Sequence, residues 1–242
     1  MRAEIAADAL LTLWENGLGQ LPSTRAEALL HAAWPGDPAP RTLGERNARL
    51  VALHQSFFGG EIELLSHCPA CGATAQFGAD CSALAAEMPP AGSASAHVLD
   101  SGDHHVEFRL PDGADVAAAA SAGSVDRFAH RLLERCVLTC ARRGEGVAVY
   151  ELPAAVLDEL SRRIEALDPG ASVSFALACP QCPARWTAPL DIGELLWEKV
   201  RHAAERLVLD VDALARHYGW TEAEVLRLSA TRRAAYLQLV GA

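Results

Sequence analysis

One short pattern occurs twice in the chain, and this internal repeat limits the folds that the chain can form. "HCPACGATAQFGADCSAL" begins at His67 and "ACPQCPARWTAPLDIGEL" begins at Ala178, and the two align without a gap. In each copy a Cys-x-x-Cys pair follows an extended run, and an aspartate, Asp80 or Asp191, comes nine residues after the second cysteine. Each copy therefore predicts a strand, a turn and a second strand, followed by a helix that the aspartate caps.

The two cysteine pairs have the residue type and the spacing of metal ligands. One pair presents two thiolates, whereas zinc in a structural site takes four ligands at the corners of a tetrahedron. The pairs are separated by far more than the usual linker of about 15 to 20 residues, but their place in the repeat makes them equivalent halves. The sequence therefore predicts one structural zinc ion with the ligands Cys68, Cys71, Cys179 and Cys182.

Two other interpretations of the pairs stay open. A thiol redox couple is one, although a thioredoxin-like motif expects a helix directly after the pair and strands are expected on both sides here. Cysteines without a shared role are the other.

The second turn also departs from the first, because Pro183 stands where the first has Gly72. Proline has no N–H to donate and cannot adopt a positive φ, so the second half of the site is expected to be strained or weaker.

Composition narrows the class of protein and its location. Half of the 242 residues are hydrophobic, which is enough to bury a core, and the formal net charge of −10 disfavours a broad nucleic-acid-binding surface. The first residues lack the basic region of a signal peptide, and no apolar run is long enough to span a membrane. We therefore expect a cytoplasmic protein, in which paired cysteines bind metal more often than they form disulfides.

Helix-start patterns and turn residues divide the chain. We expect three helices before the glycines at 59 and 60, a strand within "HVEFRLPDG", a helix over residues 125–142 and another that Pro153 opens. Residues 88–96 have the composition of a linker. In a capping box the side chain of the residue before the helix accepts a hydrogen bond from a backbone N–H of the first turn. The glutamate three residues later accepts one from the backbone N–H of that capping residue. Four such boxes are predicted: Thr24 with Glu27, Thr42 with Glu45, Asp191 with Glu194, and Thr221 with Glu224.

The last part of the chain carries the clearest helical pattern. Apolar residues recur in steps of three and four from Leu196 to Tyr218, which predicts one long helix over residues 192–218 that ends at Gly219. Two short helices, "TEAEVLRL" and "TRRAAYLQLV", are expected to follow. Bases outnumber acids from Lys199 onward, a balance that could orient a partner or belong to a solvated helix face.

The expected fold class is α+β. The chain is predicted to be mainly helical, with one small antiparallel zinc-ribbon sheet formed by the two Cys-Pro-x-Cys turns, a long C-terminal helix and a two-helix tail. The predicted regions are an N-terminal helical region over 1–60, a first zinc knuckle over 61–87, an inserted α/β region over 88–170, a second knuckle over 171–191, and the long helix with its tail over 192–242.

Other metal-binding residue types have simpler explanations. Cys136 and Cys140 are expected on one side of a helix as small buried side chains, and Cys81 aligns with a core position of the repeat. A hydrogen-bonded or solvated state is favoured over a ligand role for His67. The segment "DHHVE" contains Asp103, His104, His105 and Glu107. Adjacent histidines on a strand point to opposite faces, so a shared ion is not expected there.

Catalytic motifs are missing from the sequence. It has no HExxH, no G-x-S-x-G, no phosphate-binding loop and no G-x-G-x-x-G before a helix. Asp80 and Asp191 could be paired carboxylates, but the repeat makes them helix caps. We therefore expect neither an enzyme nor a small-molecule substrate.

The order of these segments resembles a known family. The two CPxC turns with their strands and capped helices, together with "VEFRLPDGADV" and the C-terminal "YGWTEAEVLRLSATRRAAYLQLV", are similar to the baseplate hub assembly chaperones of T-even-type phage tails. Relatives of that family occur in contractile injection systems, and "LLTLWENGLGQLPSTRAEALL" fits them. The resemblance covers residues 61–242. It implies a non-enzymatic protein that helps to assemble a baseplate, or remains part of the tail-like particle, through contacts with baseplate or tail proteins.

Partner binding is predicted for the C-terminal segment. The residues expected to contribute are Trp220, Leu226, Tyr236 and Leu239. The long helix with its two-helix tail could present an apolar groove or stripe to another subunit, and packing of that stripe on its own domain is the alternative. The alternative class is a zinc-ribbon protein that binds nucleic acid or has a regulatory role. It would need a basic face, and the sequence offers only scattered arginine pairs. A metal-dependent enzyme would need an open coordination position.

Overall fold

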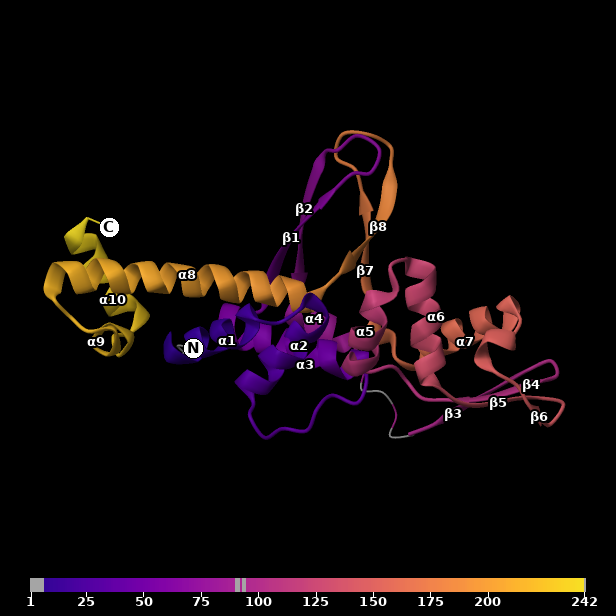
Figure 1. Ribbon diagram of the computed structural model, residues 1–242. Coiled ribbons are helices and arrows are strands. Elements are labelled where there is room, and N and C mark those ends of the chain that lie inside the picture. The colour runs from indigo at the N-terminus through magenta and orange to yellow at the C-terminus, as the bar shows by residue number, and fades with distance from the viewer. Residues whose placement is uncertain (1–6, 90–91, 93–94, 242) are drawn as a thin grey trace.

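The computed structural model describes residues 7–89, 92 and 95–241, and it has four parts (Figure 1). The body is the group of helices at the centre, and the stalk consists of two hairpins that rise from it. The lobe, residues 97–167, lies at one end of the molecule. The tail, residues 222–240, lies at the other end, on the far half of a long helix. Helices and small antiparallel sheets together confirm the α+β class.

The body contains the three helices that the sequence predicts before residue 59. Thr42 caps the third of them, since its hydroxyl oxygen accepts the Glu45 N–H at 3.2 Å. The predicted helix start at Thr24 is wrong, because the second helix already begins at Pro22, which fits the first turn where its missing N–H loses no bond. The helices are α1 (Ala7–Leu18), α2 (Pro22–Ala33) and α3 (Leu43–Phe58).

The stalk consists of two hairpins that stack face to face. The predicted single ribbon sheet is wrong, because each hairpin is a separate two-stranded antiparallel sheet. Side chains alternate along every strand, and the inner ones pack across the gap: the Phe77 and Phe175 rings lie 5.2 Å apart, and Trp186 donates from Nε1 to Ser66 Oγ at 3.0 Å. The strands are β1 (Glu61–His67), β2 (Thr74–Asp80), β7 (Val173–Ala178) and β8 (Arg185–Leu190).

Each hairpin leads into a helix, as the repeat predicts. Asp80 accepts the N–H of Ser82 at 2.9 Å and so caps α4 (Cys81–Ala86). Asp191 accepts the N–H of Glu194 at 3.0 Å and caps α8 (Ile192–Tyr218). The aligned residues after the caps, Cys81 and Ile192, are both buried in the same cluster. The sequence repeat is therefore a repeat of structure, and its two helices root the stalk in the body.

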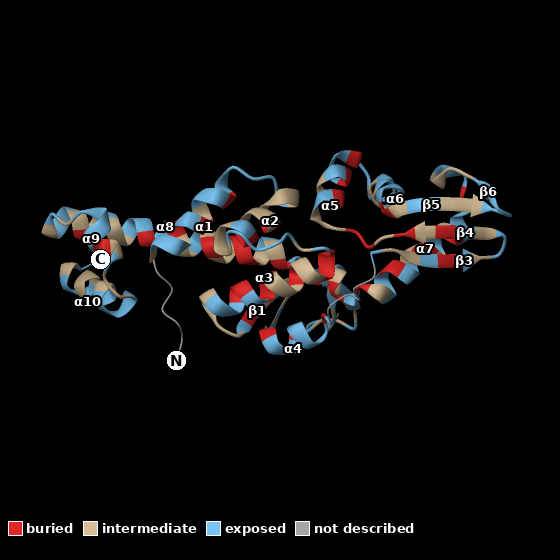
Figure 2. Ribbon diagram, turned by 90° about the horizontal axis from the view of Figure 1, so that it is seen from below, coloured by how far each residue is buried: buried red, intermediate tan, exposed pale blue. Residues whose placement is uncertain are grey.

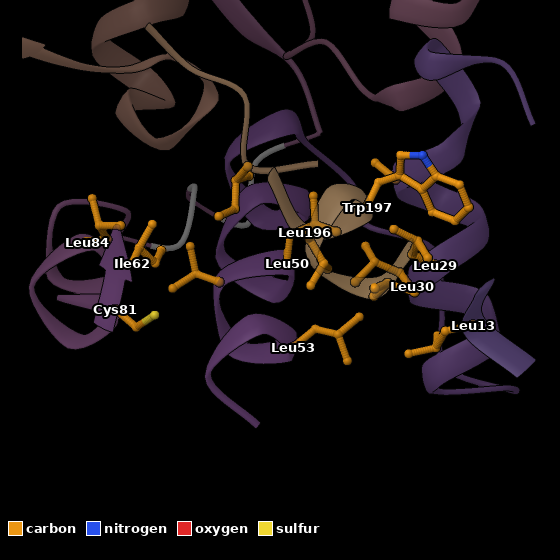
Figure 3. Packing of buried hydrophobic residues seen from close by; sticks show 14 of the residues in the cluster. Leu13, Leu29, Leu30, Leu50, Leu53, Ile62, Cys81, Leu84, Leu196 and Trp197 are labelled. Atoms are coloured by element: carbon orange, nitrogen blue, oxygen red, sulfur yellow. The ribbon is translucent and has the colours of Figure 1, made fainter. Parts of the chain in front are cut away.

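Leucines from five helices, α1, α2, α3, α4 and α8, form the main core. Leu29 of α2 and Leu50 of α3 meet Leu196 and Trp197 of α8 in one buried cluster (Figure 3). Figure 2 shows buried residues concentrated on the sides of the body helices that face one another, whereas the tail is mostly exposed or half-buried. The first half of α8 is thus part of the body, and its second half extends beyond it.

The lobe contains the clearest departure from the sequence prediction. The helix expected over residues 125–142 ends at Cys136, and Val137–Arg142 is a strand that pairs with the strand at His104–Phe108. β-branched residues favour the extended backbone there, and the pairing completes a sheet in the order β3-β4-β5-β6. Pro153 is the N-cap of the last helix of the lobe. The elements are β3 (His97–Ser101), β4 (His104–Phe108), α5 (Gly113–Ala119), η1 (Ala120–Ala122), α6 (Val125–Cys136), β5 (Val137–Arg142), β6 (Glu145–Gly146), η2 (Val149–Glu151) and α7 (Ala154–Leu167).

The end of the lobe is fastened to the start of α3. Asp168, which is buried, accepts the N–H of Gly44 at 2.9 Å, and Asn47 donates to the carbonyl of Gly170, in η3 (Pro169–Ala171), at 2.8 Å. A Cβ at position 44 would lie 1.9 Å from the Asp168 carboxylate, so only glycine permits this approach. The contact fixes the segment that leads into the second hairpin.

An ion cluster around one buried carboxylate joins α5 and α6 of the lobe to the end of β4. Asp115 of α5 is fully buried and accepts hydrogen bonds from Arg109 at 2.6 Å and from Arg135 of α6 at 2.8 Å. Burial raises the pKa of Asp115, but the hydrogen bonds from Arg109, the Asp112 backbone N–H and Arg135, with the charge of Arg109, together outweigh burial and lower it to about 2. The carboxylate therefore stays charged in the folded protein well into acid.

Replacing Asp115 with asparagine is expected to lower the free energy of unfolding by about 3 kcal/mol, because two arginines lose their buried partner. In the wild type this contribution is fully present above the ordinary Asp pKa of 3.8 and is lost as the pH falls toward 2. Urea unfolding at pH 7 and pH 3 should therefore show a smaller difference between the two proteins in acid. Asp103→Asn, which breaks an exposed pair with Arg143, is the control and should cost about 0.5 kcal/mol or less. An equal loss in both variants would contradict the assignment.

The C-terminal helices agree with their prediction. α8 spans the predicted residues 192–218, and Gly219 ends it with a φ of 70°. Thr221 and Glu224 form the predicted capping box at the start of α9 (Glu222–Leu226). α10 (Ala230–Val240) turns back along α8, where Arg233 forms an ion pair with Asp210 at 3.1 Å. The tail thus packs beside the far half of α8.

Candidate metal centre

The candidate site lies at the tip of the stalk, where the two hairpin turns meet (Figure 1). Both turns close alike: the N–H of Cys68 donates to the carbonyl of Ala73, and the N–H of Cys179 donates to that of Ala184, each at 2.9 Å. The first turn has one further bond, from Gly72, whose φ is 74°. Proline at the matching position of the second turn has no N–H to form it.

The four predicted ligands come together at this tip. The sulfurs of Cys68 and Cys182 are 3.7 Å apart, and those of Cys71 and Cys179 are 3.5 Å apart. All four lie within 4.8 Å of one another, and within residues 7–89, 92 and 95–241 they form the one group of this kind. Sulfurs at about 2.3 Å from a central zinc ion would be about 3.8 Å apart in a tetrahedron. The cluster can therefore hold a metal ion.

The thiols share hydrogen bonds, and their pKa values differ widely as a result. The N–H of Gln181 donates to Cys179 Sγ at 3.3 Å and is the main cause that lowers the pKa of Cys179 to about 7. A backbone hydrogen bond with Ala184 lowers the pKa of Cys182, but its thiol hydrogen bond with Cys179 contributes to raising that pKa to about 12. Four thiolates this close repel one another unless a cation sits between them. Metal binding would therefore release protons and weaken as the pH falls.

The position of the cluster shows what a bound ion would do. At the tip, the sulfur contacts between the hairpins join cysteines more than 100 positions apart in the chain, Cys68 with Cys182 and Cys71 with Cys179. Cys68 is buried, Cys71 is exposed and the other two are half-buried. Four protein ligands fill a tetrahedral shell and leave no position for a substrate. The arrangement suits a clamp that holds the hairpin tips together.

The remaining metal-binding residue types do not join the cluster. His67 is hydrogen-bonded through Nδ1 to Thr74 at 3.3 Å. His105 instead pairs with Asp100 at 2.6 Å across the lobe sheet. In the described residues, Asp103, His104, His105 and Glu107 form no metal-binding group.

Cys136 and Cys140 have separate structural roles. The predicted helix face that they would share is wrong, because Cys136 ends α6 and Cys140 lies on β5. Burial raises the pKa of Cys136 to about 12, so this thiol is unreactive. Cys140 donates to the carbonyl of Val147 at 2.8 Å.

Three of the four predicted partner-binding side chains pack against other residues of the same chain. The ring of Trp220 lies 4.6 Å from that of Tyr218 and 4.9 Å from that of Tyr236. Leu226 packs against the cluster between α1 and α8. Leu239 differs, since 75% of its surface is exposed. The structure leaves the partner-binding prediction untested and shows that three of these residues also shape the tail.

A groove lies between the body and the tail, in the region where the sequence predicts an apolar groove or stripe on the long helix with its two-helix tail. It has a volume of about 1030 Å³ and is lined by residues of α1, α3, α8, α9 and α10. Local patterns do not indicate the contribution of α1 and α3, because these helices come from stretches of chain distant from the long helix and its tail.

Comparisons with known proteins give no match: no family model, no curated protein and no solved structure is similar to this chain. Among the helices of the described residues, none has both the length and the apolar character needed to cross a membrane.

Proposed function

We propose that this protein is a non-enzymatic, zinc-binding assembly factor or component of the baseplate of a phage-tail-like contractile injection system. It would act in the cytoplasm and contact baseplate or tail proteins. The observation that carries the proposal is the resemblance in the order of segments: two CPxC turns, "VEFRLPDGADV" between them, and the C-terminal "YGWTEAEVLRLSATRRAAYLQLV". The four-cysteine cluster supports the proposal, because both turns contribute ligands to a single candidate metal site.

Zinc is the metal that we propose for the cluster. Four thiolates at near-tetrahedral spacing suit zinc, and iron is the other metal that takes such a set. The ion would be structural, because all four ligands come from the protein. Its role would be to hold the stalk rigid, so that the outer faces of the hairpins present a fixed surface to a partner.

Affinity capture of the tagged protein from its native host tests the function. Mass spectrometry of the captured material, and of purified tail-like particles, should find sheath, tube or baseplate proteins with the protein. Its presence in the particle would identify a component, and its absence would identify an assembly chaperone. Capture of nucleic acid or transcription proteins in a salt-dependent manner would instead favour the regulatory alternative and overturn the proposal.

Deleting residues 221–242 is expected to reduce the recovery of these partners at least tenfold, because the tail contributes to the partner surface. Leu239→Asp is a milder version, since this exposed side chain supports no core. Circular dichroism checks that both variants remain folded. Undiminished capture by a folded deletion variant would show that the tail is not needed for binding.

A further inference from the structure

The groove between the body and the tail has an apolar floor. Leu10 of α1, Phe57 of α3, Leu207 of α8 and Leu237 of α10 contribute to it, and Leu226 of α9 closes one side. Of these, Leu207 is buried and the others are half-buried, so apolar surface remains uncovered in the groove. Its volume of about 1030 Å³ can take several large apolar side chains at once.

Arginines without ion pairs line the edge of this floor. Arg206 of α8 and Arg227, directly after α9, are exposed, and neither forms an ion pair within the part of the chain that the structure describes. Hydrogen bonds from Thr221 are the main cause that lowers the pKa of Glu224, and the charge of Arg227 lowers it slightly further. The third arginine, Arg233, is paired with Asp210. The exposed carboxylate of Asp8 also lines the groove, so among the described residues the charged lining side chains that form no ion pair are two guanidinium groups and one carboxylate, an excess of one positive charge on a chain with a net charge of −10.

We propose that the groove binds an acidic amphipathic α-helix of a partner protein. This inference does not rest on the proposed function, because it concerns the chemistry of the partner and not its identity. The apolar face of the helix would cover the floor, and glutamate or aspartate side chains at its margins would pair with Arg206 and Arg227. A basic helix with the same apolar face would be rejected by like charges.

The lining favours a helix over an extended segment or a polar small molecule. All the lining elements are helices or their ends, and helices offer no free sheet edge to pair with an extended backbone. A helix satisfies its own backbone groups and so can lie on an apolar floor. Within the described residues, no lining residue carries a buried polar side-chain atom without a hydrogen bond. Among the described residues, the floor therefore offers no unpaired buried polar group that would recognise a specific small ligand.

Two fluorescent peptides of about 16 residues test the proposal by anisotropy. Both carry leucines at helical spacing, and the remaining positions are mainly glutamate in one and mainly lysine in the other. The full chain is expected to bind the glutamate peptide at least tenfold more tightly. In the double variant Arg206→Glu/Arg227→Glu the preference should reverse. The matched control is Arg162→Glu/Arg163→Glu, the same change in charge on an exposed face of α7, which should leave the preference unchanged.

A third variant tests the floor itself. Ala203→Trp fills the groove and should abolish binding of both peptides, with circular dichroism confirming the fold. Equal binding of the two peptides, an unchanged preference in the Arg206/Arg227 variant, or no binding at 100 µM, roughly the weak end of specific recognition, would overturn the proposal. So would self-association that Ala203→Trp removes, which would make a second copy the occupant. Peptide binding that appears only after removal of residues 1–6 would also overturn the proposal, because the occupant of the groove would then be a segment of this chain. Because peptides replace native partners, these outcomes are separate from those of affinity capture.

Discussion

Replacing Cys179 with serine is expected to abolish metal binding and to loosen the stalk while the body stays folded. The ion would join the hairpin tips through four metal–sulfur bonds, and a structural tetrahedral site needs all four ligands. If metal is present at a thousandfold excess over its dissociation constant, it contributes about 4 kcal/mol of stability that the variant lacks. The stalk retains its own contacts, such as Phe77 with Phe175, so the loss should be smaller than in an isolated zinc finger.

Elemental analysis and hydrogen exchange measure the two halves of this expectation. Wild type should carry one ion per chain, and the variant none. Amide exchange should accelerate in residues 61–80 and 173–190 and remain slow in the buried parts of α3. Cys140→Ser is the matched control, because a serine keeps the donor to Val147 and lies outside the cluster. A metal-free Cys179→Ser protein with a stalk as protected as in the wild type would show that the site has no structural role.

Replacing Leu196 with alanine should destabilise the whole body by about 3 to 4 kcal/mol. Leu196 has no exposed surface and packs with Leu50 where α8 enters the helices of the body (Figure 3). Truncation removes buried methyl groups and leaves a cavity that rigid helices on several sides cannot close. The effect should be global, because this cluster also holds Ile62 and Cys81 at the base of the stalk.

The same helix supplies the control. Leu209 lies on the far half of α8 with 67% of its surface exposed, so Leu209→Ala makes the same chemical change outside a core. It should alter the free energy of unfolding by about 0.5 kcal/mol or less. Denaturant unfolding measures the free energy of unfolding of both variants, Leu196→Ala and Leu209→Ala. Similar losses at the two positions would mean that the near half of α8 is not part of the body core.

Local patterns account for much of this fold. The helix at Ile192–Tyr218 and its stop at Gly219 follow from apolar periodicity and from the freedom of glycine at positive φ. Asp80 and Asp191 cap their helices as the repeat predicts. The repeat also explains why four cysteines distant in sequence converge, because each pair sits at the same turn of an equivalent hairpin.

The errors arise where distant contacts decide the structure. Val137–Arg142 continues a helical pattern in sequence, yet the backbone of β4, some 30 residues earlier, offers it a strand partner. The two hairpins stack by their inner faces. The alternation of side chains along each strand does not show whether two hairpins stack face to face or pair edge to edge into one sheet. The contribution of α1 and α3 to the groove depends on contacts between distant stretches of chain, which no local pattern contains.

X-ray absorption spectroscopy of the purified native protein tests the metal clamp most directly. With one metal ion per chain, the edge energy identifies the element and the fine structure gives its ligands. We expect zinc with four sulfur neighbours at about 2.3 Å, and loss of this signal in Cys179→Ser. A shell that contains nitrogen or oxygen, or a wild-type protein without stoichiometric metal, would contradict the clamp formed by Cys68, Cys71, Cys179 and Cys182.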